Sequence, residues 1–119
     1  MLKNLLAKPL SPDEMLCLVE EEKKLILNTC PVEELYLFGS ASRAQMTEAS
    51  DLDFLVVVAD DQSLKCVKKN YYNRKKTSIW PVDIIFMHRS DFEHKSRIGG
   101  VAMICKAEGK LLFKKENHV

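Results

Sequence analysis

The sequence predicts an α/β (α+β) fold, with a single domain over residues 1–119 and a sheet of about four strands flanked by helices. Three observations support this prediction. Helical and extended patterns alternate along the chain, 119 residues suit one domain with its own core, and the composition, 46% hydrophobic and 29% charged, is ordinary for a globular protein. The net charge of +1 indicates no particular class of partner.

The first half of the chain predicts two helices and two strands. A helix over 11–28 opens with the capping box Ser-Pro-Asp-Glu, and apolar residues then recur on one of its faces. Pro31 ends this helix, and the strand over 35–38 runs into a tight Gly-Ser turn. After a short helix over 40–47, the strand over 51–58 ends in a continuous apolar run, which predicts burial on both faces.

The second half continues the alternation. Apolar residues at helical spacing predict a helix over 62–72, and the apolar run over 81–87 predicts a third strand. Ser90-Asp91-Phe92-Glu93 is a second capping box, and Gly99-Gly100 interrupts the helical sequence that it opens. A glycine then fits a C-terminal helix cap ahead of a last strand over 110–113.

Residues suited to binding a metal ion or an anion cluster in sequence around the Gly39-Ser40 turn. Asp51 and Asp53 project to the same side of their strand, about 7 Å apart at their backbones, because side chains alternate along a strand. Two such charges repel and imply a cation, and oxygen-only ligands favour Mg²⁺ or Mn²⁺. Gly39 lets the backbone approach a ligand closely, and Ser40 begins a helix, whose N-terminus favours an anion. The phosphate chain of a magnesium-bound nucleotide would satisfy both features, because it carries the anion for the Gly-Ser turn and the cation for the two aspartates.

A third acid, Asp83, lies in the strand over 81–87 and faces the same way as Ile85 and Met87. A lone carboxylate in so apolar a strand is costly unless it is paired. If this strand lies beside the one with Asp51 and Asp53, three carboxylates converge on one metal site. Two metals held in this way can activate an attacking hydroxyl and stabilise the leaving oxygen of a displacement at phosphorus.

The combined pattern Gly39-Ser40-x-x-Arg43, Ser50-Asp51-x-Asp53 and a distant Asp83 resembles the DNA polymerase beta-like nucleotidyltransferase superfamily, and most closely its minimal nucleotidyltransferase (MNT) group. The resemblance covers roughly residues 33–113. It implies a nucleotidyltransferase-type domain with a mixed β-sheet. The implied reaction transfers a nucleoside monophosphate, AMP from ATP, to a hydroxyl acceptor, and pyrophosphate leaves.

The resemblance also implies roles for individual residues. These roles are nucleotide binding for Gly39, Ser40 and Arg43, and metal binding for Asp51, Asp53 and Asp83. Asp83 would ligate the catalytic metal or serve as the base. One departure from the family pattern is visible, because Ala44 stands where the family often has glycine. This departure bears on the geometry of the helix start and not on the metal site.

Stand-alone MNT proteins resemble the antitoxin halves of toxin–antitoxin modules whose other half is a small helical HEPN-family protein. By that resemblance, AMP would pass to a tyrosine or other hydroxyl of the partner. Larger relatives add a domain that binds the acceptor, whereas this chain ends soon after its last predicted strand. We therefore expect another copy or a different protein to complete the active site, or a protein to be the acceptor.

Two other functions stay open. The chain could be a non-catalytic module that binds and covers its partner, or it could modify a small molecule such as an aminoglycoside, although so short a chain disfavours the second. Haloacid-dehalogenase-like phosphatases and many glycosyltransferases also carry Asp-x-Asp. In those proteins an apolar strand precedes the acids, whereas here the strand 54–58 follows them.

Composition also bears on the cellular location of the protein and on its other partners. The basic segment Lys65 to Lys76 is more typical of a solvated helix face than of a nucleic-acid site. Four well-separated cysteines predict reduced, mostly buried thiols of a cytoplasmic protein. No segment reaches bilayer length, and the N-terminus lacks the continuous apolar region of a secretion signal.

Overall fold

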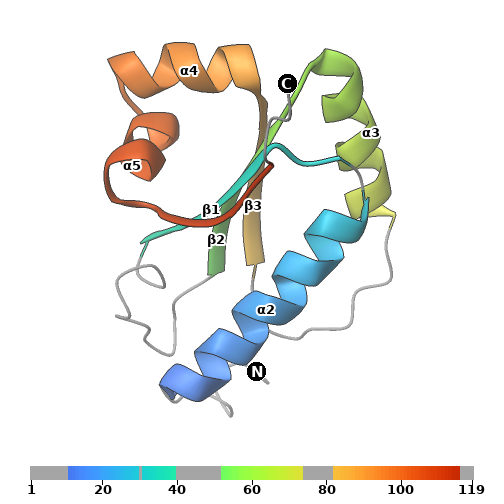
Figure 1. Cartoon of the computed structure of the whole chain (residues 1–119), viewed down its shortest axis with the longest axis vertical. Coiled ribbons are helices and arrows are strands. Elements are labelled where there is room, and N and C mark those ends of the chain that lie inside the picture. The colour runs from blue at the N-terminus through green and yellow to red at the C-terminus, as the bar shows by residue number, and fades with distance from the viewer. Residues whose placement is uncertain (1–10, 30, 40–51, 74–81, 116–119) are drawn as a thin grey trace, which may run out of the picture.

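The computed structural model describes residues 11–29, 31–39, 52–73 and 82–115 (Figure 1). The described elements, in chain order, are the helix α2 (Pro12–Thr29), the strands β1 (Glu34–Phe38) and β2 (Leu52–Val58), the helix α3 (Asp61–Tyr72), the strand β3 (Val82–His88), the helices α4 (Arg89–Ile98) and α5 (Val101–Glu108), and the strand β4 (Lys110–Lys114). The sequence predicted each of these elements to within a residue or two. The expected helix over 40–47 lies outside the described residues.

The four described strands form one mixed sheet in the order β3-β2-β1-β4. β1 is antiparallel to both β2 and β4, while β2 and β3 are parallel. This arrangement confirms the α+β class and the mixed, helix-flanked sheet. It also brings the end of β1 and the starts of β2 and β3 to the same end of the sheet.

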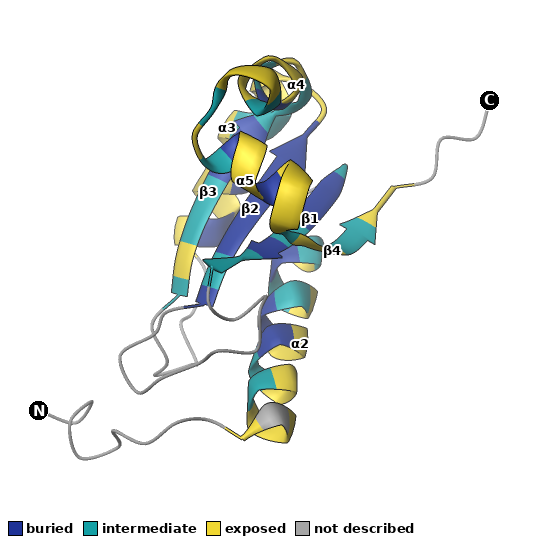
Figure 2. Ribbon diagram, turned by 90° about the vertical axis from the view of Figure 1, so that its left-hand side faces the viewer, coloured by how far each residue is buried: buried dark blue, intermediate teal, exposed yellow. Residues whose placement is uncertain are grey.

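Among the described residues, each face of the sheet has its own core and is covered by two helices. On one face, Leu52 and Phe54 pack with side chains of α2 and α3. On the other face, Leu55 and Val57 pack with side chains of α4 and α5. Residues 54–58 of β2 are 0% exposed, which confirms the predicted burial on both faces. Figure 2 shows this strand as buried along most of its length.

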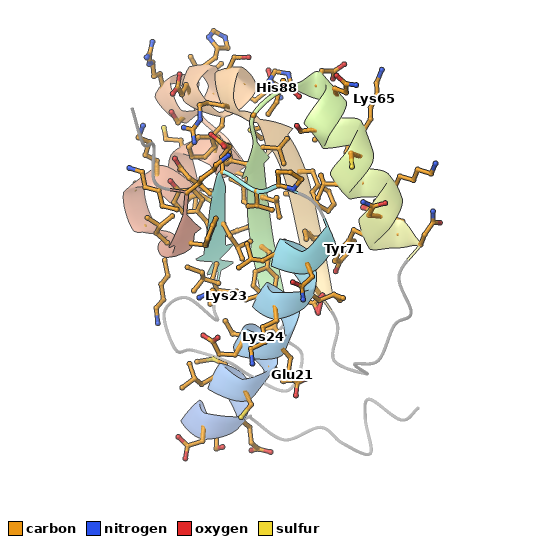
Figure 3. The ribbon with its side chains drawn as sticks, turned by 45° about the vertical axis from the view of Figure 1, so that its right-hand side comes forward. Glu21, Lys23, Lys24, Lys65, Tyr71 and His88 are labelled. Atoms are coloured by element: carbon orange, nitrogen blue, oxygen red, sulfur yellow. The ribbon has the colours of Figure 1, made fainter. Side chains whose placement is uncertain are left out.

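The helices α2 and α3 are joined by a buried polar contact. The Tyr71 hydroxyl donates to Glu22 Oε1 at 2.8 Å, and both side chains are buried. Tyr71 therefore lies on the side of α3 that faces α2, whereas Lys65 lies on the outer side of the same helix (Figure 3). Burying the hydroxyl and the carboxylate together satisfies both groups, because each would be costly alone.

The start of α2 is the capping box that the sequence predicts. Ser11 Oγ accepts a hydrogen bond from Glu14 N at 3.1 Å, and Glu14 Oε1 accepts one from Ser11 N at 3.0 Å. At α3 the cap is Asp60, whose Oδ1 accepts from Ser63 N at 2.8 Å. Both caps satisfy backbone donors that have no partner inside the helix.

The prediction of a capping box at Ser90 is wrong. β3 passes directly into α4, so the extended residue His88 caps the helix and Ser90 lies within its first turn. His88 Nδ1 accepts from Asp91 N at 3.3 Å. The pattern in the sequence was real, but the absence of a loop after β3 places the cap two residues earlier.

Two glycines separate α4 from α5, as expected. Gly99 and Gly100 have φ of +141° and +80°, a backbone conformation that other residues rarely adopt. Gly109 ends α5, but with φ of −67° it is not in the left-handed form typical of glycine caps. A Cβ on Gly109 would lie 2.6 Å from the carbonyl oxygen of Cys105, so lack of space explains this glycine.

The described cysteines correct part of the sequence prediction. Cys17, Cys66 and Cys105 are free thiols, as expected, but only Cys105 is buried. Cys17 and Cys66 lie on the exposed sides of α2 and α3, so the prediction of mostly buried thiols is wrong for these residues. Burial raises the pKa of the Cys105 thiol to about 12, which makes it unreactive. Among the described residues, no helix is both long and apolar enough to cross a membrane.

Candidate metal and nucleotide site

Three of the predicted site residues are described by the structure, and all three lie at one end of the sheet. Gly39 directly follows β1, Asp53 is the second residue of β2, and Asp83 is the second residue of β3. Asp53 is opposite Phe38 of β1 on one side and opposite Asp83 of β3 on the other. The order of the strands therefore brings Gly39 and Asp83, which are 44 positions apart in sequence, to the same end of the sheet.

Asp53 and Asp83 occupy equivalent positions on neighbouring parallel strands. Their backbones are about 4.8 Å apart, the usual spacing of paired strands. Because side chains alternate, both carboxylates belong to the face that carries Leu55 and Ile85, which α4 and α5 cover further along. Asp53 is half-buried and Asp83 is exposed. The pair is thus open to solvent beyond the edge of the second core.

Gly39 lies in direct contact with Asp53. Its φ is +76°, and a Cβ built on it would lie 2.5 Å from Asp53 Oδ2. Glycine is therefore required here twice, for the left-handed backbone and for the space that the carboxylate occupies. The turn that the sequence singled out for ligand approach packs against an acid that it singled out for metal binding.

The other predicted site residues, Ser40, Arg43 and Asp51, lie outside the described residues. Within the described ranges, no group of three or more His, Cys, Asp or Glu side chains is arranged to hold a metal ion. The structure thus brings two of the three acids together, and the full trio stays a prediction. Carboxylate oxygens from two adjacent strands are a donor set suited to a hard cation such as Mg²⁺, and a cation would also relieve their repulsion.

The opposite end of the sheet holds a second acidic cluster, which sequence reasoning missed. The Arg89 guanidinium contacts Glu34 Oε2 at 3.0 Å, Glu33 Oε1 at 3.6 Å and Glu93 Oε1 at 3.7 Å. The Tyr36 hydroxyl donates to Glu34 Oε1 at 2.5 Å. No local pattern could have revealed it, because Glu34 and Arg89 are 55 residues apart in sequence.

The protonation of this second cluster follows from its contacts. Burial disfavours the charged form of Arg89, but the hydrogen bond and charge of Glu34, with Glu33 and Glu93, outweigh burial and raise the pKa of Arg89. Burial, and then the hydrogen bond to Glu34, raise the pKa of the Tyr36 phenol. The cluster is therefore a salt bridge network with a donor for each acid, and it has a structural role.

The described lysines of the basic segment lie away from both carboxylates. Lys65, Lys68 and Lys69 are exposed on α3, and Lys65 pairs with Asp61 at 3.8 Å. α3 covers the face of the sheet opposite to the one that carries Asp53 and Asp83. These three lysines are therefore carried by the face of the sheet opposite to the candidate site.

Comparison with known families identifies the domain. The family model of the nucleotidyltransferase domain matches residues 18–107. The chain belongs to this family. The match spans β1, β2 and β3, and so includes Gly39, Asp53 and Asp83. It agrees with the resemblance to minimal nucleotidyltransferases that the sequence pattern indicated.

Solved structures of similar fold include a candidate nucleotidyltransferase from Sulfolobus solfataricus, with 21% identity and a TM-score of 0.56 over 85% of this chain and 81% of that one. A toxin–antitoxin complex with AMP-PNP aligns with 19% identity and a TM-score of 0.46 over 82% and 73% of the two chains. A mutant MntA-HpeT toxin–antitoxin aligns with 20% identity and a TM-score of 0.46 over 82% and 72%. No curated protein sequence matches the chain. At these identities the nucleotidyltransferase from Sulfolobus supports the fold alone.

Proposed function

We propose that this nucleotidyltransferase-family chain transfers AMP from ATP to a hydroxyl of a partner protein, and that it is the antitoxin half of a HEPN/MNT toxin–antitoxin module. The observation that carries the proposal is the pairing of Asp53 with Asp83 beside the Gly39 turn. Two carboxylates on one face, next to a turn that can accept a phosphate chain, suit nucleotidyl transfer better than any structural purpose.

The proposed ligands follow from that pairing. Asp53 and Asp83, with Asp51, would hold Mg²⁺ or Mn²⁺, and Gly39, with Ser40 and Arg43, would bind the triphosphate of ATP. Bound metal ions would lower the barrier by activating the attacking hydroxyl and stabilising the leaving oxygen. Because Gly39 has no side chain, the Asp53 carboxylate has room to lie against the turn.

Asp83 is the residue best placed to meet the acceptor. It is exposed, and β3 is an edge strand among the four described strands, so a hydroxyl can approach from outside the sheet. An exposed carboxylate next to the metal ligands can orient that hydroxyl and accept its proton. A large acceptor, such as a protein, fits this open edge.

The HEPN partner rests on the sequence pattern, which resembles that of stand-alone MNT antitoxins, and the cytoplasmic location rests on the well-separated cysteines. AMP on a tyrosine or other hydroxyl of the partner adds a negatively charged group, and such a group can block a functional surface. This would explain how a small transferase silences a toxin without staying bound to it.

The test is a transfer assay with purified chain, the small helical protein encoded by the neighbouring gene, Mg²⁺ and ATP labelled at its α-phosphate. We expect label and the mass of one or more AMP groups on the partner, and loss of both with EDTA. Asp53→Asn and Asp83→Asn should abolish transfer. Asp61→Asn is the matched control, because Asp61 is an exposed acid on α3, on the far face of the sheet, and should keep full activity.

Each alternative function predicts a different result. A complex that forms without any label on the partner would favour the non-catalytic binding module. Label on an aminoglycoside, with none on protein, would favour a small-molecule transferase. Transfer that persists in Asp53→Asn would show that the metal-site assignment is wrong.

A further inference from the structure

The helix α5 is apolar on its outer side as well as its inner side. Ala102 and Cys105 face the second core and are buried. Met103 and Ile104, on the opposite side, are 45% and 44% exposed, and Ala107 falls between them on a helical projection. Figure 2 shows this outer side of α5 open to solvent. A surface helix normally presents polar residues outward, and a helix that is apolar all round is normally covered.

The neighbouring strand extends this apolar surface. Leu111 of β4 is opposite Tyr36 of β1, and Tyr36 packs with the α4 and α5 side of the sheet. The Leu111 side chain therefore lies on the same side as α5, and it is 46% exposed. We call Met103, Ile104 and Leu111 the α5–β4 patch. Exposed apolar residues scattered singly need no explanation, but three of them on consecutive elements, on the same side of the sheet, make a candidate interaction site.

The charged residues of α5 and β4 are mostly positive. From Val101 to Lys115 the chain has four lysines and one acid, Glu108. Arg97, Lys106 and Lys110 are exposed and form no ion pair with another residue that the structure describes. A second copy of the chain would bring like charges together, whereas a surface with acidic side chains would complement them.

The patch also lies close to the candidate site. Lys110, at the start of β4, is opposite Leu37, two residues before Gly39. Three strand intervals separate β4 from β3, which is roughly 14 Å at about 4.8 Å each. Both the patch and the Asp53 and Asp83 pair lie on the α4 and α5 side of the sheet. A protein bound at the patch can therefore reach the carboxylates with one of its own side chains.

We propose that the α5–β4 patch binds an apolar helix flanked by acidic side chains, and that this helix belongs to the protein that accepts the nucleotide. The second clause rests on the proposed function, whereas the first does not. The size of the patch suits one crossing helix, because α5 has eight residues and is about 12 Å long. Docking here would hold the acceptor protein beside Asp83.

The test uses two fluorescein-labelled helical peptides of identical apolar face, one flanked by glutamates and one by lysines, with binding followed by fluorescence anisotropy. We expect the wild-type chain to bind the glutamate peptide at least about tenfold more tightly. The double variant Met103→Glu/Ile104→Glu should lose at least about tenfold in affinity for it. Lys106→Glu/Lys110→Glu should reverse the preference between the peptides.

The matched control is Leu16→Glu, which places a glutamate on an exposed leucine of α2. It should bind as wild type does, and thermal unfolding should show that every variant is folded. Saturation by neither peptide up to millimolar concentration, or equal loss in Leu16→Glu, would overturn the proposal. Dimerisation of the wild-type chain that Met103→Glu abolishes would also overturn it, because a second copy would then cover the patch.

The docking and transfer proposals can fail separately. Asp53→Asn should keep wild-type affinity for the glutamate peptide, because Asp53 lies outside the patch, while it loses transfer. Peptide binding without transfer by the wild-type chain would leave the docking surface standing and reject the proposed function. Full transfer to a protein by the Met103→Glu/Ile104→Glu variant would leave the proposed function standing and reject the docking surface.

Discussion

The two ends of the sheet both gather acidic residues, but they neutralise them differently. At one end, Glu34 is 7% exposed and the chain supplies Arg89 and the Tyr36 hydroxyl as its partners. At the other end, Asp83 is exposed beside Asp53, and no described cation pairs with Asp83. Acids that stabilise a fold are paired within it, whereas the acids of the proposed metal site would be neutralised by a bound cation.

The same comparison extends to backbone geometry. The Arg89 end is built from ordinary strand and helix conformations, with Glu34 in β1 and Arg89 at the first turn of α4. The Asp53 end includes Gly39, whose positive φ and missing Cβ make room for a carboxylate. A turn that only glycine can form without strain, next to an exposed acid, is typical of a site where the backbone must leave room for a functional group.

The largest effect should come from Asp83→Asn. Transfer should fall by at least about 100-fold, because a proposed metal ligand or base is lost. Stability should not fall, because the substitution removes repulsion from Asp53 and breaks no ion pair with a described residue. Transfer assays and urea unfolding on the same sample check both statements. A variant that loses stability but keeps its activity would contradict the distinction between the two ends.

Arg89→Met should show the opposite behaviour. It leaves the buried carboxylate of Glu34 without its cation, and we expect a loss of about 2 kcal/mol in the free energy of unfolding, between the values for exposed and fully buried pairs. Activity per folded molecule should be unchanged. Arg97→Met is the control, because it removes an exposed arginine of the same helix that pairs with no described residue. Equal losses in the two variants would remove any special role for Arg89.

Gly39→Ala should lower activity by at least about tenfold, because its new Cβ would displace the Asp53 carboxylate, and small displacements of reacting groups are costly. Gly100→Ala is an unusually close control. Its φ of +80° matches the +76° of Gly39, but no atom lies within 4 Å of its added Cβ. Both variants should lose roughly 1–3 kcal/mol of stability from backbone strain, and only Gly39→Ala should lose transfer. Similar activities would show that the contact with Asp53 is unimportant.

Local sequence patterns predicted the helices and strands, and they predicted which face of its own strand each acid of the site occupies. The capping box at Ser11, the apolar run of β2 and the alternation that sets Asp83 on the Ile85 side of its strand are short-range features, and the structure confirms each. The adjacency of Asp53 and Asp83 needed strand order, which the sequence left conditional. The Arg89 network and the α5–β4 patch escaped prediction, because both depend on which helix covers which face of the sheet.

The smallest effect concerns Asp60, an exposed acid that lies beyond the end of β2, toward the Arg89 end of the sheet. Backbone and side-chain hydrogen bonds from Ser63 lower the pKa of Asp60 below its ordinary 3.8, with the charge of His88 a lesser cause. Because the folded pKa is the lower one, the cap stabilises the protein above pH 3.8, and this contribution is lost as the pH falls through the folded value. Asp60→Ser retains a capping oxygen that does not titrate. Urea unfolding at pH 7 and pH 3 should therefore show a smaller acid-induced loss of stability in Asp60→Ser than in the wild type. Equal losses would mean that Asp60, unlike Glu34, does not stabilise the Arg89 end of the sheet.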